Sequence, residues 1–307
     1  MNQGIFGFPA ALNNNIISTT EIDVSGSYLI KPGTKRLIIF AIGAGAGGGA
    51  GGRRASGVTQ SGGGGGGQGG IILQDFNVED LGGANTTLSI TIGAGSAGGI
   101  GASSSNVPGS QSVGTAGSTI VTVTGKPGNL ILCLGGDNGG GGSTSAPSTP
   151  TVRTGFVKGV AAPNVYATNS AIGTGSSVVV YNMLYCCGAQ GGGLDIDAVN
   201  TSGGSITAGT SVGTSVSNPN FATTVYTGGT QLSTVVVPIN STDQVFGKMS
   251  PGFGGAGGGS GSAENGQNGA NGYRGSGGGG GGSTLNGFTS GSGGRGGNGY
   301  VCIVALA

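Results

Sequence analysis

Long tracts of glycine set the strongest limit on how this chain can fold. They occupy residues 43–49, 62–67, 252–261, 275–282 and 291–299, and 77 of the 307 residues are glycine. Glycine buries no side chain and loses more backbone entropy on folding than any other residue, so such a fold depends on backbone hydrogen bonds and close backbone packing. Disorder is disfavoured, because only 7% of the residues are charged and runs of Val, Ile and Leu recur.

Apolar runs adjoin the tracts. Residues 37–42 lead into the first tract, residues 130–134 lead into Gly135, and the last tract leads into residues 300–306. Residues 88–92 alternate between apolar and polar side chains, which is typical of a half-buried strand. Strand and glycine tract therefore form one repeating unit, and no stretch has the period of an amphipathic helix.

The dipeptide Pro32-Gly33 suits a type II turn, whose third position needs a positive φ. It predicts a hairpin that joins residues 28–30 to residues 35–42.

The tracts themselves cannot form a collagen helix, which needs glycine at every third position and abundant proline, whereas this chain has 10 Pro and no strict triplet. A left-handed helix of the polyproline II type has three residues per turn and no internal hydrogen bonds. Its N–H and C=O groups can bond to neighbouring helices if side chains do not separate them. We predict a mostly β fold with little or no helix, in which short β-hairpins and packed polyglycine II helices form a glycine-rich sandwich.

The net charge, the apolar runs and the amino-terminal residues disfavour nucleic-acid-binding, membrane-spanning and secreted proteins. Eleven Lys and Arg against ten Asp and Glu give a net charge of +1, so we expect no nucleic-acid partner. No apolar run approaches the roughly 18 residues of a membrane helix, and the first residues lack a signal-peptide layout. We expect no membrane insertion and synthesis in the cytosol.

The residues that most enzymes and metal sites use are scarce. There is no His, which excludes Ser-His-Asp and Cys-His catalysis, and the four Cys show no C-x-x-C spacing. Cys133 and Cys302 lie in apolar runs and are predicted to be buried hydrophobic residues. Asp195 and Asp197 leave a glycosidase as an alternative, although few bulky residues could build its pocket. We expect no enzyme activity, no cofactor and no metal.

Composition divides the chain into two domains. Residues 1–24 contain no glycine tract and are predicted to be an attachment or oligomerisation arm, with a flexible terminus as the alternative. Residues 25–307 form the glycine-rich domain, with a long loop-rich insert at 143–251 that is rich in Ser, Thr and Pro.

Three motifs resemble the glycine-rich domain of tailed-phage tail fibres and related adhesins. They are YLIKPGTKRL at residues 28–37, ITIGAG at 90–95 and GGRGGNGYVCI at 293–303, and the resemblance covers about residues 25–307. The chain departs from that pattern at Ile42, where an aromatic residue is frequent, and at its end, where residues 305–307 replace an aromatic.

The resemblance implies a non-enzymatic phage virion protein. It would be a tail fibre or tail-tip adhesin, assembled in the host cytoplasm, that binds a bacterial surface protein or polysaccharide through loops between glycine tracts. Other virion tail or fibre proteins would be its partners, and it would form a homotrimer. The alternative is a purely structural virion component, such as a head fibre, spike or fibre rod. An ice-binding protein is a third alternative, which the long inserts disfavour.

Receptor contacts are expected from aromatic and arginine side chains outside the tracts, since rigid rings and guanidinium groups are favoured in recognition loops. The candidates are Arg53, Arg54, Tyr166, Tyr185, Phe221, Tyr226, Tyr273, Arg274 and Phe288.

Overall fold

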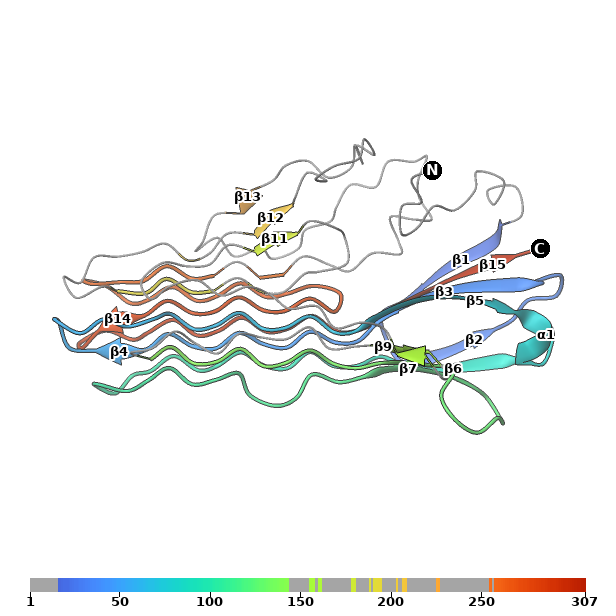
Figure 1. The fold of residues 1–307 in the computed structure, drawn as a ribbon, viewed down its shortest axis with the longest axis horizontal. Coiled ribbons are helices and arrows are strands. Elements are labelled where there is room, and N and C mark those ends of the chain that lie inside the picture. Colours follow the sequence, from blue (N-terminus) through green and yellow to red (C-terminus); the bar gives the residue numbers. More distant parts are fainter. Residues whose placement is uncertain are drawn as a thin grey trace.

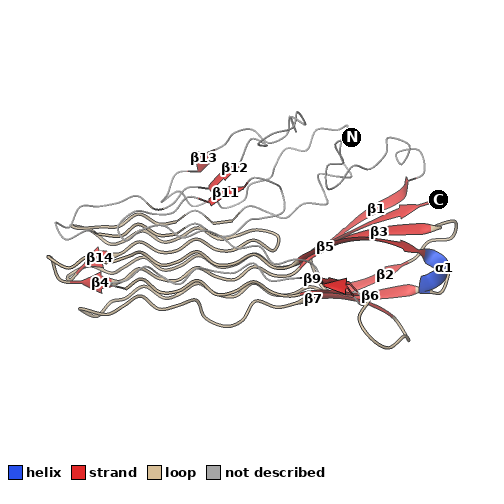
Figure 2. Ribbon diagram, viewed as in Figure 1, coloured by secondary structure: helices blue, strands red, loops and turns tan. Residues whose placement is uncertain are grey.

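The computed structural model describes residues 16–143, 188, 190–194, 203, 254–255 and 257–307, and the backbone of five short strands in the insert. The strands of its two largest sheets and a single helical turn gather at one end, and the glycine tracts run side by side from there to the other end (Figures 1 and 2). We call these parts the sheet end (residues 16–42, 71–93, 118–134 and 300–307) and the glycine body (the other described residues). The far end of the glycine body, around β4 and β14, is the tip.

The first sheet of the sheet end contains four antiparallel strands in the order β1-β15-β3-β5. Their bounds are Ile16–Ile22 for β1, Tyr300–Leu306 for β15, Arg36–Ile42 for β3 and Ile71–Asn77 for β5. One helical turn, α1 (Val78–Leu81), follows β5.

The second sheet has the order β10-β9-β8-β7-β6-β2, also antiparallel. Its strands are β2 (Gly26–Leu29), β6 (Thr87–Thr91), β7 (Thr119–Val123), β8 (Ile131–Cys133), β9 (Gly155–Val157) and β10 (Val160–Ala161). Two smaller sheets consist of β11 (Val178–Val180), β12 (Ile206–Ala208) and β13 (Val225–Tyr226), and of β4 (Arg53–Arg54) with β14 (Thr284–Leu285). The prediction of a mostly β fold with almost no helix is confirmed.

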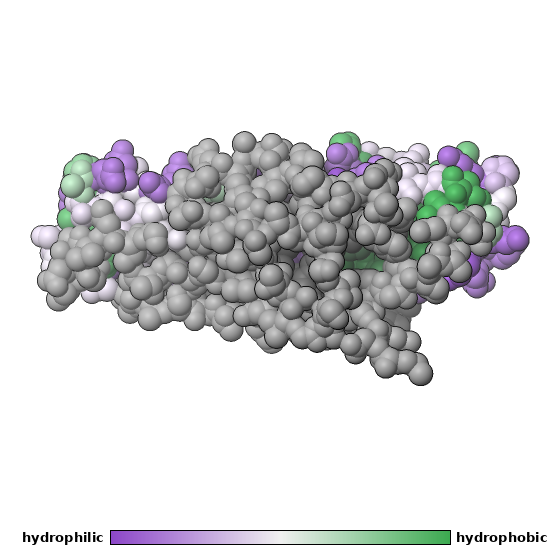
Figure 3. Space-filling model, turned by 90° about the horizontal axis from the view of Figure 1, so that it is seen from above, coloured by the Kyte–Doolittle hydropathy of each residue, from purple (hydrophilic) through white to green (hydrophobic). Residues whose placement is uncertain are grey.

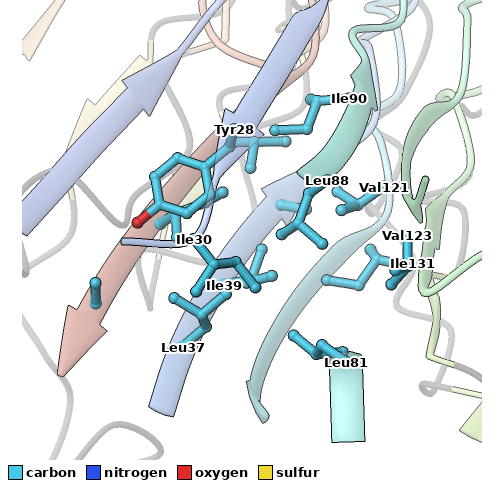
Figure 4. Close-up of a cluster of buried hydrophobic side chains, with 14 of the residues drawn as sticks. Tyr28, Ile30, Leu37, Ile39, Leu81, Leu88, Ile90, Val121, Val123 and Ile131 are labelled. Atoms are coloured by element: carbon cyan, nitrogen blue, oxygen red, sulfur yellow. The ribbon is translucent and has the colours of Figure 1, made fainter. Parts of the chain in front are cut away.

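The core of the sheet end lies between the two large sheets. Figure 4 shows Leu37 and Ile39 of β3 together with Leu88 and Ile90 of β6, all of them buried. In β6 buried and exposed positions alternate, as the sequence pattern predicted. Cys133 in β8 and Cys302 in β15 are both buried, which confirms the prediction for them.

The two central strands of the first sheet, β15 and β3, are apolar on both faces. Every residue of β15, and every residue of β3 after Arg36, is buried. One face joins the core between the sheets, and the other carries Phe40, Tyr300 and Val304. Figure 3, seen from above, shows hydrophobic residues gathered at this end of the molecule.

The turn at Pro32-Gly33 is confirmed, but the hairpin around it is wrong. Gly33 has φ +84°, and the N–H of Thr34 donates to the carbonyl of Lys31 at 3.2 Å. The strands on either side do not pair, because β2 joins β6 in the second sheet and β3 joins β5 and β15 in the first. The turn carries the chain from the second sheet to the first. A local turn pattern does not determine whether the strands that flank it pair with each other.

The glycine tracts continue the strands in the same register. Ile42 of β3 pairs with Ile71 of β5, and just beyond them Gly43 donates to Gly70 at 2.9 Å. The next donor along this side is Ala46, which bonds to Gly67 at 2.9 Å. Hydrogen bonds to one neighbour recur at every second residue in the strand and at every third residue in the tract.

The other residues of the same tract bond elsewhere. The N–H groups of Gly45, Gly48 and Gly51 all donate to residues 291–297. Taken together, the backbone bonds of residues 43–52 reach six other segments, which are residues 64–70, 96–99, 110–117, 136–142, 278–284 and 291–297. An interior tract is thus hydrogen-bonded to neighbours on all sides rather than to two neighbours in a sheet.

Close approach of backbones explains why these positions are glycine. A Cβ atom on Gly48 would lie 2.1 Å from the carbonyl oxygen of Gly279, and one on Gly51 would lie 2.0 Å from that of Gly282. No rotation of a side chain could relieve either clash, because the opposing atoms are backbone.

One strand of the structure falls within the predicted amino-terminal arm. The predicted arm, residues 1–24, includes β1, which pairs with β15 along Ile16–Ile22. Residues 1–15 and most of the 143–251 insert lie outside the described residues.

Candidate binding site at the tip

Three chain segments meet at the tip, at the end of the molecule opposite the C-terminus (Figure 1). The short strand β4 pairs in parallel with β14, and Arg53 also forms an antiparallel bridge with Val107. The N–H of Arg53 donates to the carbonyl of Val107 at 2.9 Å. The segment at 53–60 therefore lies between the loops at 102–108 and 284–289.

Two asparagines connect these loops. The Asn106 side-chain oxygen accepts from the N–H of Ala55 and from Nδ2 of Asn286, both at 3.1 Å. In return the Asn286 side-chain oxygen accepts from the Asn106 N–H at 3.1 Å. Asn106 has φ +59°, a left-handed conformation that Asn adopts more readily than most residues. The loops are thus held in one arrangement by side chains of their own.

Beneath the tip, a buried glutamine joins the segments again. Gln60 is fully buried, and its Nε2 donates to the carbonyl of Thr284 at 2.7 Å. The hydroxyl of Thr284 donates to the carbonyl of Gly261 at 2.8 Å. These bonds fix β14 on the end of the glycine body, so the loops are carried by a rigid support.

The arginines of the tip have carbonyl partners instead of carboxylates. Arg53 is 8% exposed, and its Nη1 donates to the carbonyl of Ser103. Nη1 of Arg54 donates to the carbonyl of Asn106 at 3.3 Å. The Nε atoms of both arginines are buried and have no hydrogen-bond partner.

Two arginines away from the tip pair with carboxylates instead. Arg36 forms an ion pair with Asp75, and Arg274 forms one with Glu21 at 2.8 Å. Within the described part of the chain, no carboxylate lies within ion-pair distance of either arginine at the tip. The loops at 55–60, 102–108 and 285–289 contain no Asp or Glu at all.

Apolar side chains lie beside these cations. Val58 is 39% exposed and Val107 is 37% exposed, and Phe288 is half-buried. The tip thus combines apolar surface with two positive charges. Seen from above, this end shows hydrophilic residues with a small hydrophobic area among them (Figure 3).

Two further candidates, Tyr273 and Arg274, lie away from the tip, where the glycine body meets the first sheet. The Arg274 guanidinium lies 4.1 Å from the ring centre of Tyr300 and donates to Glu21 of β1. The Tyr300 hydroxyl donates to the same Glu21 oxygen at 2.9 Å. Burial would lower the pKa of Arg274, but Tyr300, Tyr273 and Glu21 together raise it. Burial raises the pKa of Tyr300. This cluster ties β1 and β15 to the glycine body.

Of the predicted receptor contacts, the structure brings together Arg53, Arg54 and Phe288 at the tip. Tyr166, Tyr185 and Phe221 lie outside the described residues, and Tyr226 ends β13, where only the backbone is described.

Sequence reasoning missed Asn106 and Asn286. Asn286-Gly287 is a turn dipeptide and could have marked one of them, whereas nothing in the run 103–106 indicates that Asn106 connects three segments.

A row of asparagines on the side of the glycine body was also missed. The side-chain oxygens of Asn265, Asn268 and Asn271 accept the N–H groups of Thr289, Ser292 and Arg295, each at 2.8 Å. The sequence signal is the repeat N-G-x over residues 265–273. In this row a side-chain carboxamide oxygen accepts the N–H group that a backbone carbonyl accepts in the interior tracts.

Over the described residues, the longest helix is the four-residue α1, and none could span a membrane. In the same part of the chain, no group of three or more His, Cys, Asp or Glu side chains is placed to hold a metal ion.

The fold and the tip define a mostly β, glycine-rich domain with loops at its far end. A family model described as a glycine-rich domain matches residues 20–306, and the chain belongs to this family. No curated protein matches the sequence.

Proposed function

We propose that this protein is a bacteriophage tail fibre or tail-tip adhesin that binds the bacterial surface through its tip. The observation that carries the proposal is the convergence of Arg53 and Arg54 with Phe288, which is far from them in the sequence, on one rigid end of the molecule. Ile16 of β1 and Leu306 of β15 lie side by side at the opposite end, where the domain would join other virion tail or fibre proteins. On the virion it would form a homotrimer, and its receptor would be a surface protein or polysaccharide.

The glycine body would be built of packed polyglycine II helices. What supports this is the period of three in the hydrogen bonds of residues 43–51 and the exposure of residues 94, 97 and 100 between buried residues 93, 96 and 99. A crystal structure tests it: φ near −75° and ψ near +145° are expected throughout the tracts, with a rise of about 3.1 Å per residue. Pleated strands that alternate with a period of two would overturn it.

Such a body suits an adhesin because its stability comes from backbone bonds. The described loops at the tip contribute few side chains to the stability of the glycine body, so the loop sequences can change while the glycine body stays folded.

Binding to whole cells tests the function. The purified, fluorescently labelled protein would be offered to a panel of bacterial strains beside the variant V58S/F288A, which removes apolar surface from the tip. Val24→Ser is the matched control, since Val24 is 73% exposed and lies at the sheet end. Thermal unfolding would verify that each variant is folded.

Strain-selective binding by the wild-type protein and Val24→Ser, lost in V58S/F288A, is the expected result. Equal binding by all three proteins would place the receptor contact away from the tip. If the folded wild-type protein binds no strain, the adhesin proposal fails and a purely structural virion component, the alternative, is favoured.

A further inference from the structure

We propose that the tip binds a single anionic group, a carboxylate or a phosphate, carried by a bacterial surface polysaccharide, and that Arg54 donates hydrogen bonds to it while Arg53 adds positive charge behind Arg54. The inference rests on the proposed function and names the chemistry of the same site.

The first step of the argument is the cost of an unpaired buried cation. Arg53 is 8% exposed, its Nη1 bonds to the Ser103 carbonyl, and its Nε has no partner. Burying a charge is costly unless it is paired, and buried arginines are therefore usually matched by a carboxylate. The partly buried Arg274, which pairs with Glu21, follows that rule in this protein, and Arg53 does not.

The second step is the placement of the two guanidinium groups. Arg53 and Arg54 donate to carbonyls three residues apart in one loop, those of Ser103 and Asn106. Each guanidinium has five N–H donors in a fixed fork, which matches the geometry of carboxylate and phosphate. Within the described part of the chain, the hydrogen bonds of the two arginines use only Nη1 of each. Arg54 is the more exposed of the two, so it would contact the anion while Arg53 adds charge behind it.

Neighbouring carboxylates do not compete for these donors. Glu264 is an acidic residue whose backbone is linked to the tip. Its carbonyl accepts a hydrogen bond at 2.9 Å from the hydroxyl of Thr284, the residue that pairs with Arg53. Its side chain is exposed and forms no ion pair with Arg53 or Arg54 in the described part of the chain.

The surroundings favour one anionic group on a sugar chain over a polyanion. The net charge of the whole chain is only +1, so no broad positive field would attract nucleic acid. Exposed Ser104 and Ser105 can exchange hydrogen bonds with sugar hydroxyls, and half-buried Phe288 offers an apolar ring face for the sugar.

The test uses the full chain and immobilised polysaccharides of defined charge. The probes are phosphorylated lipopolysaccharide, a capsular polysaccharide that contains uronic acid, and neutral dextran. The lipopolysaccharide is also offered after phosphatase treatment and the capsular material after reduction of its carboxyl groups, so that the source of the anion is identified. Affinity is measured at low and high salt, because binding to a partly exposed cation weakens with salt.

The variants separate charge from fold. Arg54→Gln removes the exposed donor and Arg54→Lys keeps the charge without the fork. Arg295→Gln is the control, since Arg295 is an exposed arginine on the side of the glycine body with Asn298 as its partner. We expect Arg54→Gln to bind about 10- to 100-fold more weakly, because hydrogen bonds to charged groups are lost. Arg54→Lys should lose less, and Arg295→Gln should bind like the wild type.

Binding to one charged probe, abolished when its anionic group is removed, supports the inference. If Arg54→Gln binds cells as tightly as the wild type, the anionic site is overturned and the adhesin proposal stands. Loss of cell binding after protease treatment of the cells would show a protein receptor and overturn the polysaccharide. If the wild type binds no cells, the failure is that of the proposed function itself.

Discussion

A buried position in the sheet end is filled by a side chain, whereas a buried position in the glycine body is filled by the backbone of a neighbouring tract. Leu88 and Ile39 are fully buried against other aliphatic side chains. At Gly48 the corresponding space holds the carbonyl of Gly279, and a Cβ atom would lie 2.1 Å from its oxygen. The two parts should therefore respond to opposite mutations, one to loss of side-chain volume and the other to its gain.

The two parts nevertheless share one hydrogen-bond register. Tyr300 of β15 pairs with Ile42 of β3, and beyond this pair Gly45 donates to Gly297 at 2.8 Å. A strand that loses its side chains can gain neighbours above and below the sheet. The difference between a two-layer β structure and a bundle of backbones thus depends on side chains alone.

The largest effect is expected from adding one methyl group inside the glycine body. Gly48→Ala should cost about 4 kcal/mol or more, or prevent folding, because two backbones must separate. Gly26→Ala is the control at the sheet end, where the nearest atom is the Val24 carbonyl oxygen at 3.9 Å. Denaturant unfolding measures both. If Gly48→Ala and Gly26→Ala unfold alike, the glycine body is not held by close backbone contact.

Removing side-chain volume should destabilise the sheet end more than the glycine body. Leu88→Ala is expected to cost about 2–5 kcal/mol, because it leaves a cavity in a core with no water access. Ala50→Gly, at a fully buried position of the glycine body, should cost only about 1 kcal/mol. The comparison would fail if the two truncations destabilised the protein equally in the same denaturant series.

Much of the sheet end could be predicted from the sequence, because its strands are apolar runs beside glycine tracts. Residues 37–42 and 300–306 became β3 and β15, and the alternation at 88–92 became β6. The pairing could not be predicted in the same way. The turn at Pro32-Gly33 is typical of a hairpin, yet β3 pairs with β5 and with β15 from the end of the chain.

The candidate site was less predictable than the fold. Arg53, Arg54 and Phe288 were chosen because of their residue types, and only the three-dimensional structure places them together. Asn106 has no local signal, since its role depends on Asn286, which is distant in the sequence. The asparagine row could have been predicted, because Asn265, Asn268 and Asn271 recur at every third position of the sequence.

A smaller effect should follow from breaking the asparagine row. Asn268→Ala leaves the N–H of Ser292 without its partner at 2.8 Å and should cost about 1 kcal/mol, since water can replace part of the lost bond. Hydrogen exchange gives the sharper readout: the Ser292 amide should exchange faster in Asn268→Ala than in Thr115→Ala, an exposed substitution on the same body. Unchanged exchange would mean that the carboxamides do not stabilise the tracts.

The last effect concerns alkaline pH and acts on the sheet end without changing its contacts at neutral pH. Burial raises the pKa values of Tyr28 and Tyr300 above the ordinary value of 10.0. Below that pH both tyrosines are neutral in the folded and the unfolded protein, so their contribution to stability is complete. As the pH rises above it, the unfolded chain releases protons that the fold retains, and stability falls by about 1.4 kcal/mol per pH unit for each tyrosine.

The slope of stability against pH is the measurement, taken from denaturant unfolding on both sides of that pH. Tyr300→Phe should begin at lower stability, because the hydrogen bond to Glu21 is lost, but its slope should be shallower than that of the wild type. Tyr28→Phe should also flatten the slope, because burial raises the pKa of Tyr28 as well. If the double variant loses stability as steeply as the wild type, ionisation of the sheet end does not control alkaline unfolding.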